Sequence, residues 1–279
     1  MEVVKSVKEL RKAIDIQRQS GLAIGFVPTM GALHEGHLSL VNRAGKETDF
    51  VVVSIFVNPT QFNNKEDLVR YPRTLEKDLL LLEKTACQLV FAPSVEEVYP
   101  EEDTRKFNFG SIENVMEGKF RPGHFNGVAQ VVSKLFDMVR PDKAFFGLKD
   151  FQQVAIINKM VEMLKLDLEI VPCPIVRESS GLALSSRNAL LSPVEKENAC
   201  LISKTLFSAV EMAKNHSVDE VKQWVIGTID KNPYLQTEYF EIVDFNELTP
   251  INNWDANVNK IGCIAVHCGK VRLIDNVIF

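Results

Sequence analysis

The chain has 279 residues, of which 46% are hydrophobic and 25% are charged, as is typical of a soluble globular protein with one large or two ordinary domains. Its 32 lysines and arginines against 37 aspartates and glutamates give a net charge of −5, which argues against a nucleic-acid partner. Any anionic ligand would therefore have to be bound by a few local cations.

The N-terminal stretch MEVVKSVKELRKAID lacks the apolar core of a signal peptide, and no later run is long enough to cross a membrane. The five cysteines form no CxxC pair. Cys263 and Cys268 are interpreted as packing residues on a pair of strands, rather than as metal ligands or a disulfide. We therefore expect a cytoplasmic protein without a membrane partner.

Apolar runs of strand length alternate with helical patterns in the first part of the chain. We predict an opening helix over residues 7–18 and then strands over 22–27, 49–57, 87–93, 143–147 and 166–172. Between them we predict a helix that begins near residue 33 and helices over 73–85, 126–140 and 150–165. This alternation indicates an α/β fold, a Rossmann-like parallel sheet with helices on both faces. Such sheets bind ligands at the carboxyl ends of their strands.

The pattern changes near residue 175. Two helices are predicted over 193–215 and 218–231, followed by strands over 237–245, 261–268 and 270–278, the last two forming a hairpin at Gly269-Lys270. We therefore predict two domains. Residues 1–175 would form the Rossmann-like domain, and residues 176–279 would form a smaller α+β domain.

The stretch FVPTMGALHEGHLSL places His34 and His37 just beyond a glycine-bearing turn, where a strand leads into a helix. Helix N-termini attract anions, so we interpret the stretch as a phosphate site. A zinc site would need a third ligand, and a Walker A loop would need Lys-Ser/Thr where His37 and Leu38 stand. The alternative, that both histidines are ordinary helix residues, stays open at this point.

Two further segments carry groups that could bind phosphate. In FFGLKD, Lys149 lies in the first turn of a helix, where a cation is unfavourable unless an anion lies beside it, while Asp150 is a natural N-cap. In GLALSSRN, the hydroxyls of Ser185 and Ser186 and the guanidinium of Arg187 could surround phosphates. Taken alone, this second segment is better explained as a simple turn between domains.

The segment FVNPTQF places two amides, Asn58 and Gln61, after a strand, where a polar small molecule would bind. Capping and turn formation are the alternative, more strongly for Asn58 than for Gln61. Arg121 and His124, in KFRPGHFNG, could steer an anion or could be ordinary exposed loop residues.

Together these segments resemble known proteins. The His-x-x-His and Ser-Ser-Arg pair is similar to the paired signatures of the nucleotidyltransferase superfamily, which includes class I tRNA synthetases. More closely, the chain resembles the family of pantoate–β-alanine ligases nearly from end to end. The motifs that carry this resemblance are VPTMGALHEGHLSLV, FVNPTQF, YPRT, RPGHFNGVAQVV, FFGLKDFQQ, SSRN and VRLIDN.

The resemblance implies an enzyme that condenses (R)-pantoate with β-alanine, uses ATP and Mg²⁺, and releases AMP and pyrophosphate through a pantoyl adenylate. It also implies a homodimer, in which residues 1–175 of each chain bind nucleotide and pantoate and residues 176–279 cover the active site. The implied catalytic residues are His37, with His34 beside it, and Lys149. The implied ATP-binding residues are Met30, Gly31, Ala32, Leu33, His34, Glu35, Gly36, His37, Gly147, Leu148, Lys149, Asp150, Val176, Leu184, Ser185, Ser186 and Arg187.

For the other substrates, the resemblance implies that Gln61 and Gln153 bind pantoate and that Gln61 and Asn58 bind β-alanine. Mg²⁺ would be held mainly by the ATP phosphates. Leu184 stands where the family leads us to expect methionine, but both side chains are apolar and similar in volume, so a packing role is retained.

Two other functions are compatible with part of the sequence pattern. A nucleotidyltransferase that joins a nucleotide to a phosphorylated metabolite could use the same histidines, but it should need more cations than FVNPTQF offers. An RNA-binding relative of the synthetases is disfavoured by the negative net charge and by the lack of a basic stripe interleaved with aromatic residues.

Overall fold

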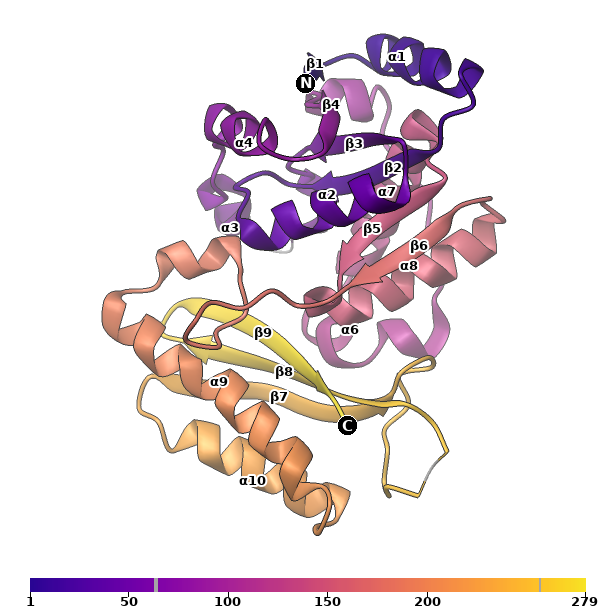
Figure 1. The fold of residues 1–279 in the computed structure, drawn as a ribbon. Helices are drawn as coiled ribbons and strands as arrows, with labels where there is room; N and C mark the ends of the chain where they lie inside the picture. The colour runs from indigo at the N-terminus through magenta and orange to yellow at the C-terminus, as the bar shows by residue number, and fades with distance from the viewer. Residues whose placement is uncertain (63–64, 256) are drawn as a thin grey trace. The chain divides into compact units, whose positions relative to one another are not determined.

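The computed structural model describes residues 1–62, 65–255 and 257–279 (Figure 1). Contacts within the chain divide it into two compact units. Unit 1 consists of Met1–Phe109, Arg121–Leu148 and Gln153–Pro174, and unit 2 consists of Gly110–Phe120, Lys149–Gln152 and Ile175–Phe279. Two short segments inside the predicted first domain therefore group with unit 2, and the binding roles assigned to the two domains stay predictions.

The sheet of unit 1 is parallel throughout. Among the described residues it has six strands in the order β1-β4-β3-β2-β5-β6, as Figure 1 shows. They are β1 (Glu2–Val4), β2 (Ile24–Thr29), β3 (Phe50–Ile55), β4 (Cys87–Phe91), β5 (Lys143–Gly147) and β6 (Glu169–Cys173). The prediction of a Rossmann-like parallel sheet is confirmed.

The first strand was missed by the sequence analysis, which began with a helix. Glu2 to Val4 pair in parallel with β4, Glu2 lying opposite Leu89 and Val4 opposite Phe91. Three residues are too few to show a period of two, and the pairing partner lies almost ninety residues later in the chain, so the pattern carried no signal.

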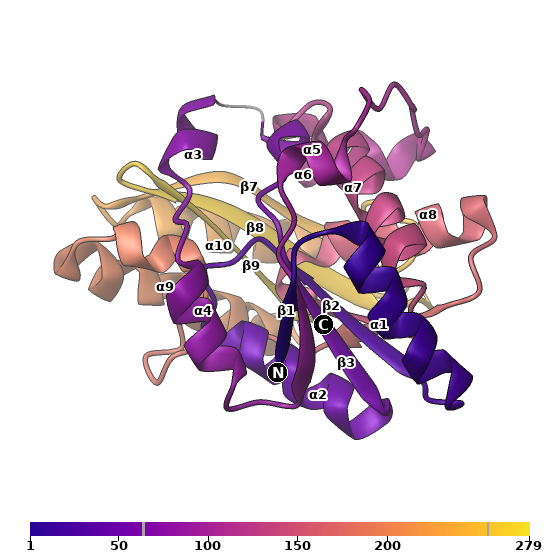
Figure 2. The ribbon, with the colours of Figure 1, turned by 90° about the horizontal axis from the view of Figure 1, so that it is seen from above.

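Helices cover both faces of this sheet. Helix α2 packs Leu38, Val41 and Ala44 into one core together with strand residues such as Val27 and Val53. On the other face, Phe136 of α7 meets Phe26 and Phe146 edge-on. Helix α1 packs against α7, and Figure 2 shows the ribbon of both helices from above. The helices that begin or lie in unit 1 are α1 (Val7–Gln19), α2 (Glu35–Glu47), α3 (Lys65–Arg70), α4 (Leu75–Leu82), α5 (Val95–Val98) and α7 (His124–Val139). Helix α8 (Phe151–Leu164) begins in the segment 149–152 and continues in unit 1.

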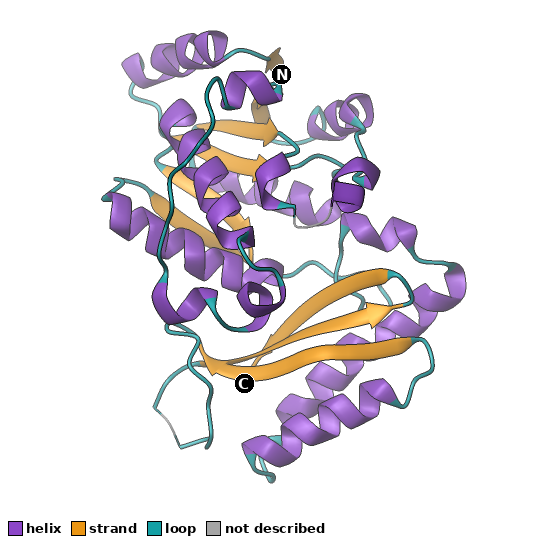
Figure 3. Ribbon diagram, turned by 180° about the vertical axis from the view of Figure 1, so that it is seen from behind, coloured by secondary structure: helices purple, strands orange, loops and turns teal. Residues whose placement is uncertain are grey.

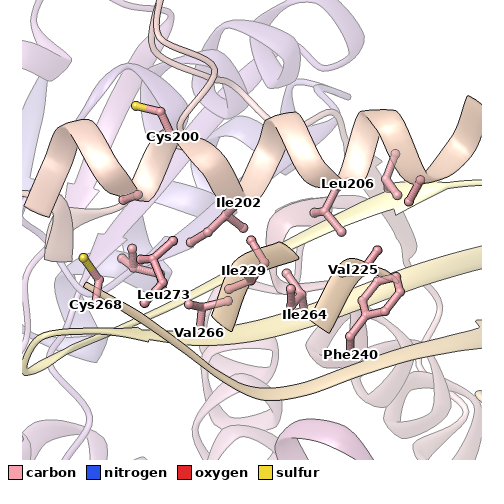
Figure 4. Close-up of a cluster of buried hydrophobic side chains, with 14 of the residues drawn as sticks. Cys200, Ile202, Leu206, Val225, Ile229, Phe240, Ile264, Val266, Cys268 and Leu273 are labelled. Atoms are coloured by element: carbon pink, nitrogen blue, oxygen red, sulfur yellow. The ribbon is translucent and has the colours of Figure 1, made fainter. Parts of the chain in front are cut away.

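The described part of unit 2 contains an antiparallel sheet of three strands, β7 (Leu235–Asp244), β8 (Lys260–Cys268) and β9 (Val271–Ile278) (Figure 3). Its helices are α6 (Met116–Phe120), α9 (Pro193–Met212) and α10 (Val218–Asp230). Figure 4 shows the buried core, in which Ile202 and Leu206 of α9 and Val225 of α10 lie near Phe240 and Ile264 of the sheet. The predicted small α+β unit and its β8–β9 hairpin are confirmed.

Cys263 and Cys268 lie on the single strand β8, so the expectation that they sit on a pair of strands is wrong. All five cysteines are free and buried, as packing residues should be. Among the residues described, no helix combines the length and the apolar character needed to span a bilayer.

Candidate active site

Three predicted segments of unit 1 end neighbouring strands. Strand β2 lies between β3 and β5 in the sheet, and all three run in the same direction. The histidine loop follows β2, the Asn58–Gln61 segment follows β3, and Gly147 ends β5. The carboxyl ends of parallel strands open on one edge of a sheet, which is where such folds bind ligands. The structure therefore brings these segments to a common edge.

The loop between β2 and α2 is held by a buried carboxylate. Gly31 and Ala32 adopt left-handed backbone angles, with φ of +80° and +49°. They aim the N–H groups of Ala32 and Leu33 at the Asp78 carboxylate, at 3.0 and 2.8 Å. A Cβ on Gly31 would lie 3.0 Å from Asp78 Oδ2 and 3.1 Å from Ile55 Cγ2, so a larger residue does not fit without displacement.

Asp78 was missed by the sequence analysis. It lies on α4, is only 1% exposed, and also accepts the Thr74 hydroxyl at 3.3 Å. The available signal was its spacing in TLEKDLLLLEK: with Leu75, Leu79 and Leu82 it shares the apolar face of the helix. An acidic residue on a core-facing stripe needs buried hydrogen-bond donors, and the loop amides supply them.

The two histidines cap helix α2 reciprocally. His34 is the N-cap, and its Nδ1 accepts the backbone N–H of Gly36 at 3.1 Å. Nδ1 of His37 accepts the backbone N–H of His34 at 3.3 Å, and the two rings lie 4.1 Å apart. A ring nitrogen that accepts a hydrogen bond carries no proton, so in the neutral form both rings carry their proton on Nε2. The pair therefore presents two Nε2–H donors.

Four backbone amides of the histidine loop have acceptors within the protein, namely those of Ala32, Leu33, His34 and Gly36. These four amides therefore do not carry the predicted phosphate site, which depends on the two imidazoles and stays a prediction. Contacts of individual loop residues with ATP stay predictions.

Asn58 is the centre of a buried hydrogen-bond network. It is 1% exposed, and its Oδ1 accepts the Tyr99 hydroxyl at 2.9 Å. Its Nδ2 donates to the carbonyl of Gly127 and to Gln61 Oε1, both at 3.2 Å. Gln61 in turn places Nε2 2.9 Å from Met30 Sδ. These bonds give Asn58 an orienting role toward Gln61, while its predicted direct contact with β-alanine stays untested.

Helix α7 supports the same turn. Ring atom Nδ1 of His124 lies 2.9 Å from the Gln61 carbonyl oxygen and, because a carbonyl only accepts, Nδ1 must donate. Gly127 approaches so closely that a Cβ there would lie 2.5 Å from the Thr60 oxygen. His124 is 5% exposed, so it is not the exposed loop residue that the sequence suggested as an alternative.

Gln153 and its neighbour Gln152 differ in their surroundings. Gln152 is buried, and its amide donates to the carbonyls of Ile112 and Val115 while its Oε1 accepts the Glu117 N–H. Gln153, on the first turn of α8, is partly exposed. Of the two, Gln153 is therefore the one that retains an accessible amide, as its predicted contact with pantoate requires.

In unit 2, a small hairpin joins predicted ATP-binding residues. The Leu184 N–H donates to the Val176 carbonyl at 3.0 Å, so these two residues lie side by side. Ser185 then caps the short 3₁₀ helix Ser186–Leu190, its hydroxyl accepting the Arg187 N–H at 3.2 Å. The local fold thus orders the Ser-Ser-Arg segment, and its contact with ATP stays a prediction.

Strand β9 explains the VRLIDN motif. Asp275 binds the Arg177 guanidinium with two hydrogen bonds of 2.6 and 2.9 Å, next to Val176 on the hairpin. Asn276 donates to the backbone carbonyl of Lys149 at 3.1 Å. The Lys149 ammonium itself lies 3.5 Å from the Asp150 carboxylate. One strand end therefore anchors both predicted ATP-binding segments of unit 2.

A buried charge network holds the segment 110–120 to the sheet of unit 2. Glu117, 7% exposed, accepts two hydrogen bonds from Arg272 at 2.9 and 2.6 Å and one from the Tyr239 hydroxyl at 2.8 Å. Burial is the largest single influence on neighbouring Glu238 and opposes its charged form, but the hydrogen bonds and charges of Arg272 and His267 together outweigh it and lower the pKa of Glu238. Burial likewise raises the pKa of Tyr239. The sequence analysis did not identify this network.

No group of three or more histidine, cysteine or acidic side chains among the described residues is arranged to hold a metal ion. The predicted site residues offer imidazoles and amides in unit 1 and hydroxyls, an ammonium and a guanidinium in unit 2. Groups of this kind bind carboxylates and phosphates.

The chain matches known proteins over its whole length. Residues 2–278 match the family model described as pantoate-beta-alanine ligase. The chain is 58% identical to a pantothenate synthetase of Phocaeicola vulgatus over 278 residues, covering 99% of both chains. It is 56% identical to that of Bacteroides fragilis, covering 99% of this chain and 98% of the relative.

Solved structures agree. The pantothenate synthetase of Thermus thermophilus superposes with a TM-score of 0.93 at 44% identity, covering 99% of each chain. The pantoate-beta-alanine ligase of Francisella tularensis, solved with β,γ-ATP and β-alanine, gives a TM-score of 0.80 at 36% identity. That comparison covers 100% of this chain and 97% of the other.

Proposed function

The chain belongs to the pantoate–β-alanine ligase family, and we propose that it performs the ATP-dependent ligation in two steps, through a pantoyl adenylate. In the first step a carboxylate oxygen of (R)-pantoate attacks the α-phosphorus of ATP, and pyrophosphate leaves. In the second, the amine of β-alanine attacks the acyl carbon, AMP leaves, and the nitrogen loses a proton to give pantothenate.

The side chains at the sheet edge suit this chemistry. Each substrate supplies its own nucleophile, so the protein needs no activated serine or cysteine. It must instead align an anion with a polyanion and neutralise the charge that develops on the phosphoryl oxygens. The observation that carries the proposal is the His34–His37 pair, whose Nδ1 atoms are both acceptors, so that both Nε2–H groups are donors.

The other groups take complementary roles. Lys149 and Arg187 are the cations proposed for the ATP phosphates, with the hydroxyls of Ser185 and Ser186 beside Arg187. From the family resemblance, Mg²⁺ would be held mainly by the ATP phosphates, whose charge it would reduce. The remaining proposed ATP contacts are Met30, Gly31, Ala32, Leu33, Glu35, Gly36, Gly147, Leu148, Asp150, Val176 and Leu184.

Gln61 and Gln153 are the residues that we propose for pantoate, since neutral amides can bind both hydroxyl and carboxylate groups. Gln61 is also proposed to contact β-alanine, with Asn58 holding the Gln61 amide in place. A homodimer in the cytoplasm is proposed from the family resemblance alone, and light scattering on the purified protein would test the dimer.

Isotope exchange tests the two-step reaction. With pantoate and Mg²⁺ present and β-alanine absent, the enzyme should exchange labelled pyrophosphate into ATP, because the first step is complete without the amine. Exchange that requires β-alanine, or that proceeds without pantoate, would contradict the adenylate. A nucleotidyltransferase would exchange only with its own phosphorylated acceptor.

A further inference from the structure

We infer that Asp78 is a positioning residue for the reaction. By accepting hydrogen bonds from the backbone of Ala32 and Leu33, it fixes the positions of the His34 and His37 side chains. The inference deepens the proposed function and rests on it for the meaning of the activity measurements. Asp78 itself is 1% exposed and lies on α4, so it acts through the loop rather than on a substrate.

The geometry is that of a backbone anion nest. Successive N–H groups of Ala32 and Leu33 converge because Gly31 and Ala32 have positive φ angles, and such concave N–H pairs bind anions. Here each amide takes a separate oxygen of one carboxylate, Ala32 binding Oδ2 and Leu33 binding Oδ1. The anion that fills the nest is therefore part of the protein.

This bidentate contact fixes the two residues directly before His34. Ala32 has a side chain, so its left-handed backbone is unfavourable unless the surroundings compensate. Asp78 supplies that compensation. If the carboxylate were lost, Ala32 could relax to ordinary angles, and the direction in which His34 enters the helix would change. The orientations of both rings depend on this direction, because the ring of His34 is hydrogen-bonded to the backbone of Gly36 and the ring of His37 to the backbone of His34.

The same contact directs where phosphate can bind. With the nest occupied by a buried negative charge, ATP phosphates are excluded from the amides of Ala32 and Leu33 and left to the imidazoles. Asp78 thus has two effects on the loop: it sets the geometry of the histidines, and it closes a competing anion site.

The variant Asp78→Asn tests the inference. Asparagine has nearly the same shape, but only one oxygen can accept, so one of the two loop amides is left facing an NH₂ group. Displacing catalytic groups by about 1 Å can cost about a hundredfold in rate. We expect kcat for pantothenate synthesis to fall by that order, with the KM for ATP changed by less than about threefold.

Thr74→Val is the matched control. It removes the hydroxyl that binds Asp78 but leaves both loop amides bonded, and Thr74 makes no side-chain cap to α4. Its kcat should stay near the wild-type value. Hydrogen exchange of the peptide that contains residues 30–34 should accelerate in Asp78→Asn and not in Thr74→Val. This exchange does not depend on which reaction is catalysed, so it tests the loop contact even if the proposed function fails.

Wild-type kcat or unchanged amide exchange in Asp78→Asn would overturn the inference. So would a fall in activity that only matches the fraction of unfolded protein. Should Asp78→Asn not fold, Gly31→Ala disturbs the contact from the other side, since the added Cβ would lie 3.0 Å from Asp78 Oδ2. A folded Gly31→Ala enzyme with normal kcat would also overturn it.

Discussion

The backbone N–H of His34 donates to the ring of His37, three residues later, as the N-cap of a helix donates to glutamate in an ordinary capping box. The ring of His34 in turn accepts the backbone N–H of Gly36, two residues later in the first turn of the helix. Each imidazole thus serves the helix through Nδ1 and carries its donor proton on Nε2. The two roles can be separated by substitution.

His34→Asn should separate capping from catalysis. Asparagine is a strong N-cap whose oxygen can accept the Gly36 N–H, whereas alanine cannot accept. We expect His34→Ala to lose about 1 kcal/mol of stability and His34→Asn much less. Both variants should lose turnover. Thermal unfolding and initial rates measure the two effects, and a fully active His34→Asn enzyme would show that the His34 ring serves the helix alone.

His37→Ala and Lys149→Ala should each lose most of their turnover while staying folded. Removing one donor from a developing oxyanion costs about a hundredfold or more in rate. Steady-state kinetics and circular dichroism on the purified variants provide the check. Near-normal turnover in either variant would show that the substituted residue is not catalytic.

Gln61→Ala and Gln153→Ala should raise the KM for pantoate far more than the KM for ATP, because amides select the acid and cations hold the phosphates. The adjacent Gln152→Ala is the matched control, because the amide of Gln152 donates to the carbonyls of Ile112 and Val115. This variant should be less stable than the wild type, but its KM for pantoate should not rise more than its KM for ATP. If the Gln61 and Gln153 variants weaken both substrates equally, the amides shape the fold instead.

Gly127→Ala should displace the turn that carries Gln61. The new Cβ would lie 2.5 Å from the Thr60 oxygen, and overpacking of this kind costs about 1–3 kcal/mol. We expect lower stability and a higher KM for pantoate. In Gly227→Ala, on α10, the Cβ meets nothing within 4 Å, so stability should rise by about 0.5–1 kcal/mol. Equal effects in the two variants would mean that the close approach at Gly127 is unimportant.

Cys87 and Cys173 should be unreactive in the folded protein. Burial raises the pKa of Cys87 to about 12 and that of Cys173 to about 11. The thiolate is the reactive form, so at pH 8 both thiols stay protonated as long as the chain is folded. Peptide-resolved labelling with an alkylating reagent should modify them only in denaturant. Rapid labelling of the native protein would show that their strands open readily.

The sequence predicted elements that show a clear local pattern. The run from Val51 to Val53 is buried on both faces and could only be a central strand, and the His-x-x-His spacing marked the loop before α2. What it could not show were contacts between distant segments. Asp78 meets Ala32 across 46 residues, and Glu117 meets Arg272 across 155, so no window of periodicity contains either pair.

The hydrogen bonds that each histidine ring makes could not be predicted from the sequence either. A motif states which side chains are present, but which ring nitrogen accepts a hydrogen bond depends on backbone angles around His34. At that residue the backbone is extended, with φ of −145°, and Nδ1 accepts the Gly36 N–H. The sequence alone did not show this contact, and phosphate binding at the helix start stays a prediction.

The carboxylate of Glu117 limits how this protein can be divided. A gene fragment that began at residue 175 would encode Arg272 and Tyr239 without the acid that both of them bind. Arg272 would keep its ion pair with Glu238, but Arg272 and Tyr239 would both lose their hydrogen bonds to Glu117. Buried polar groups that lose a partner are costly, so such a fragment should be less stable than the same residues in the whole chain. Recombination that exchanges C-terminal halves between relatives would succeed only if the short stretch around Glu117 travelled with them.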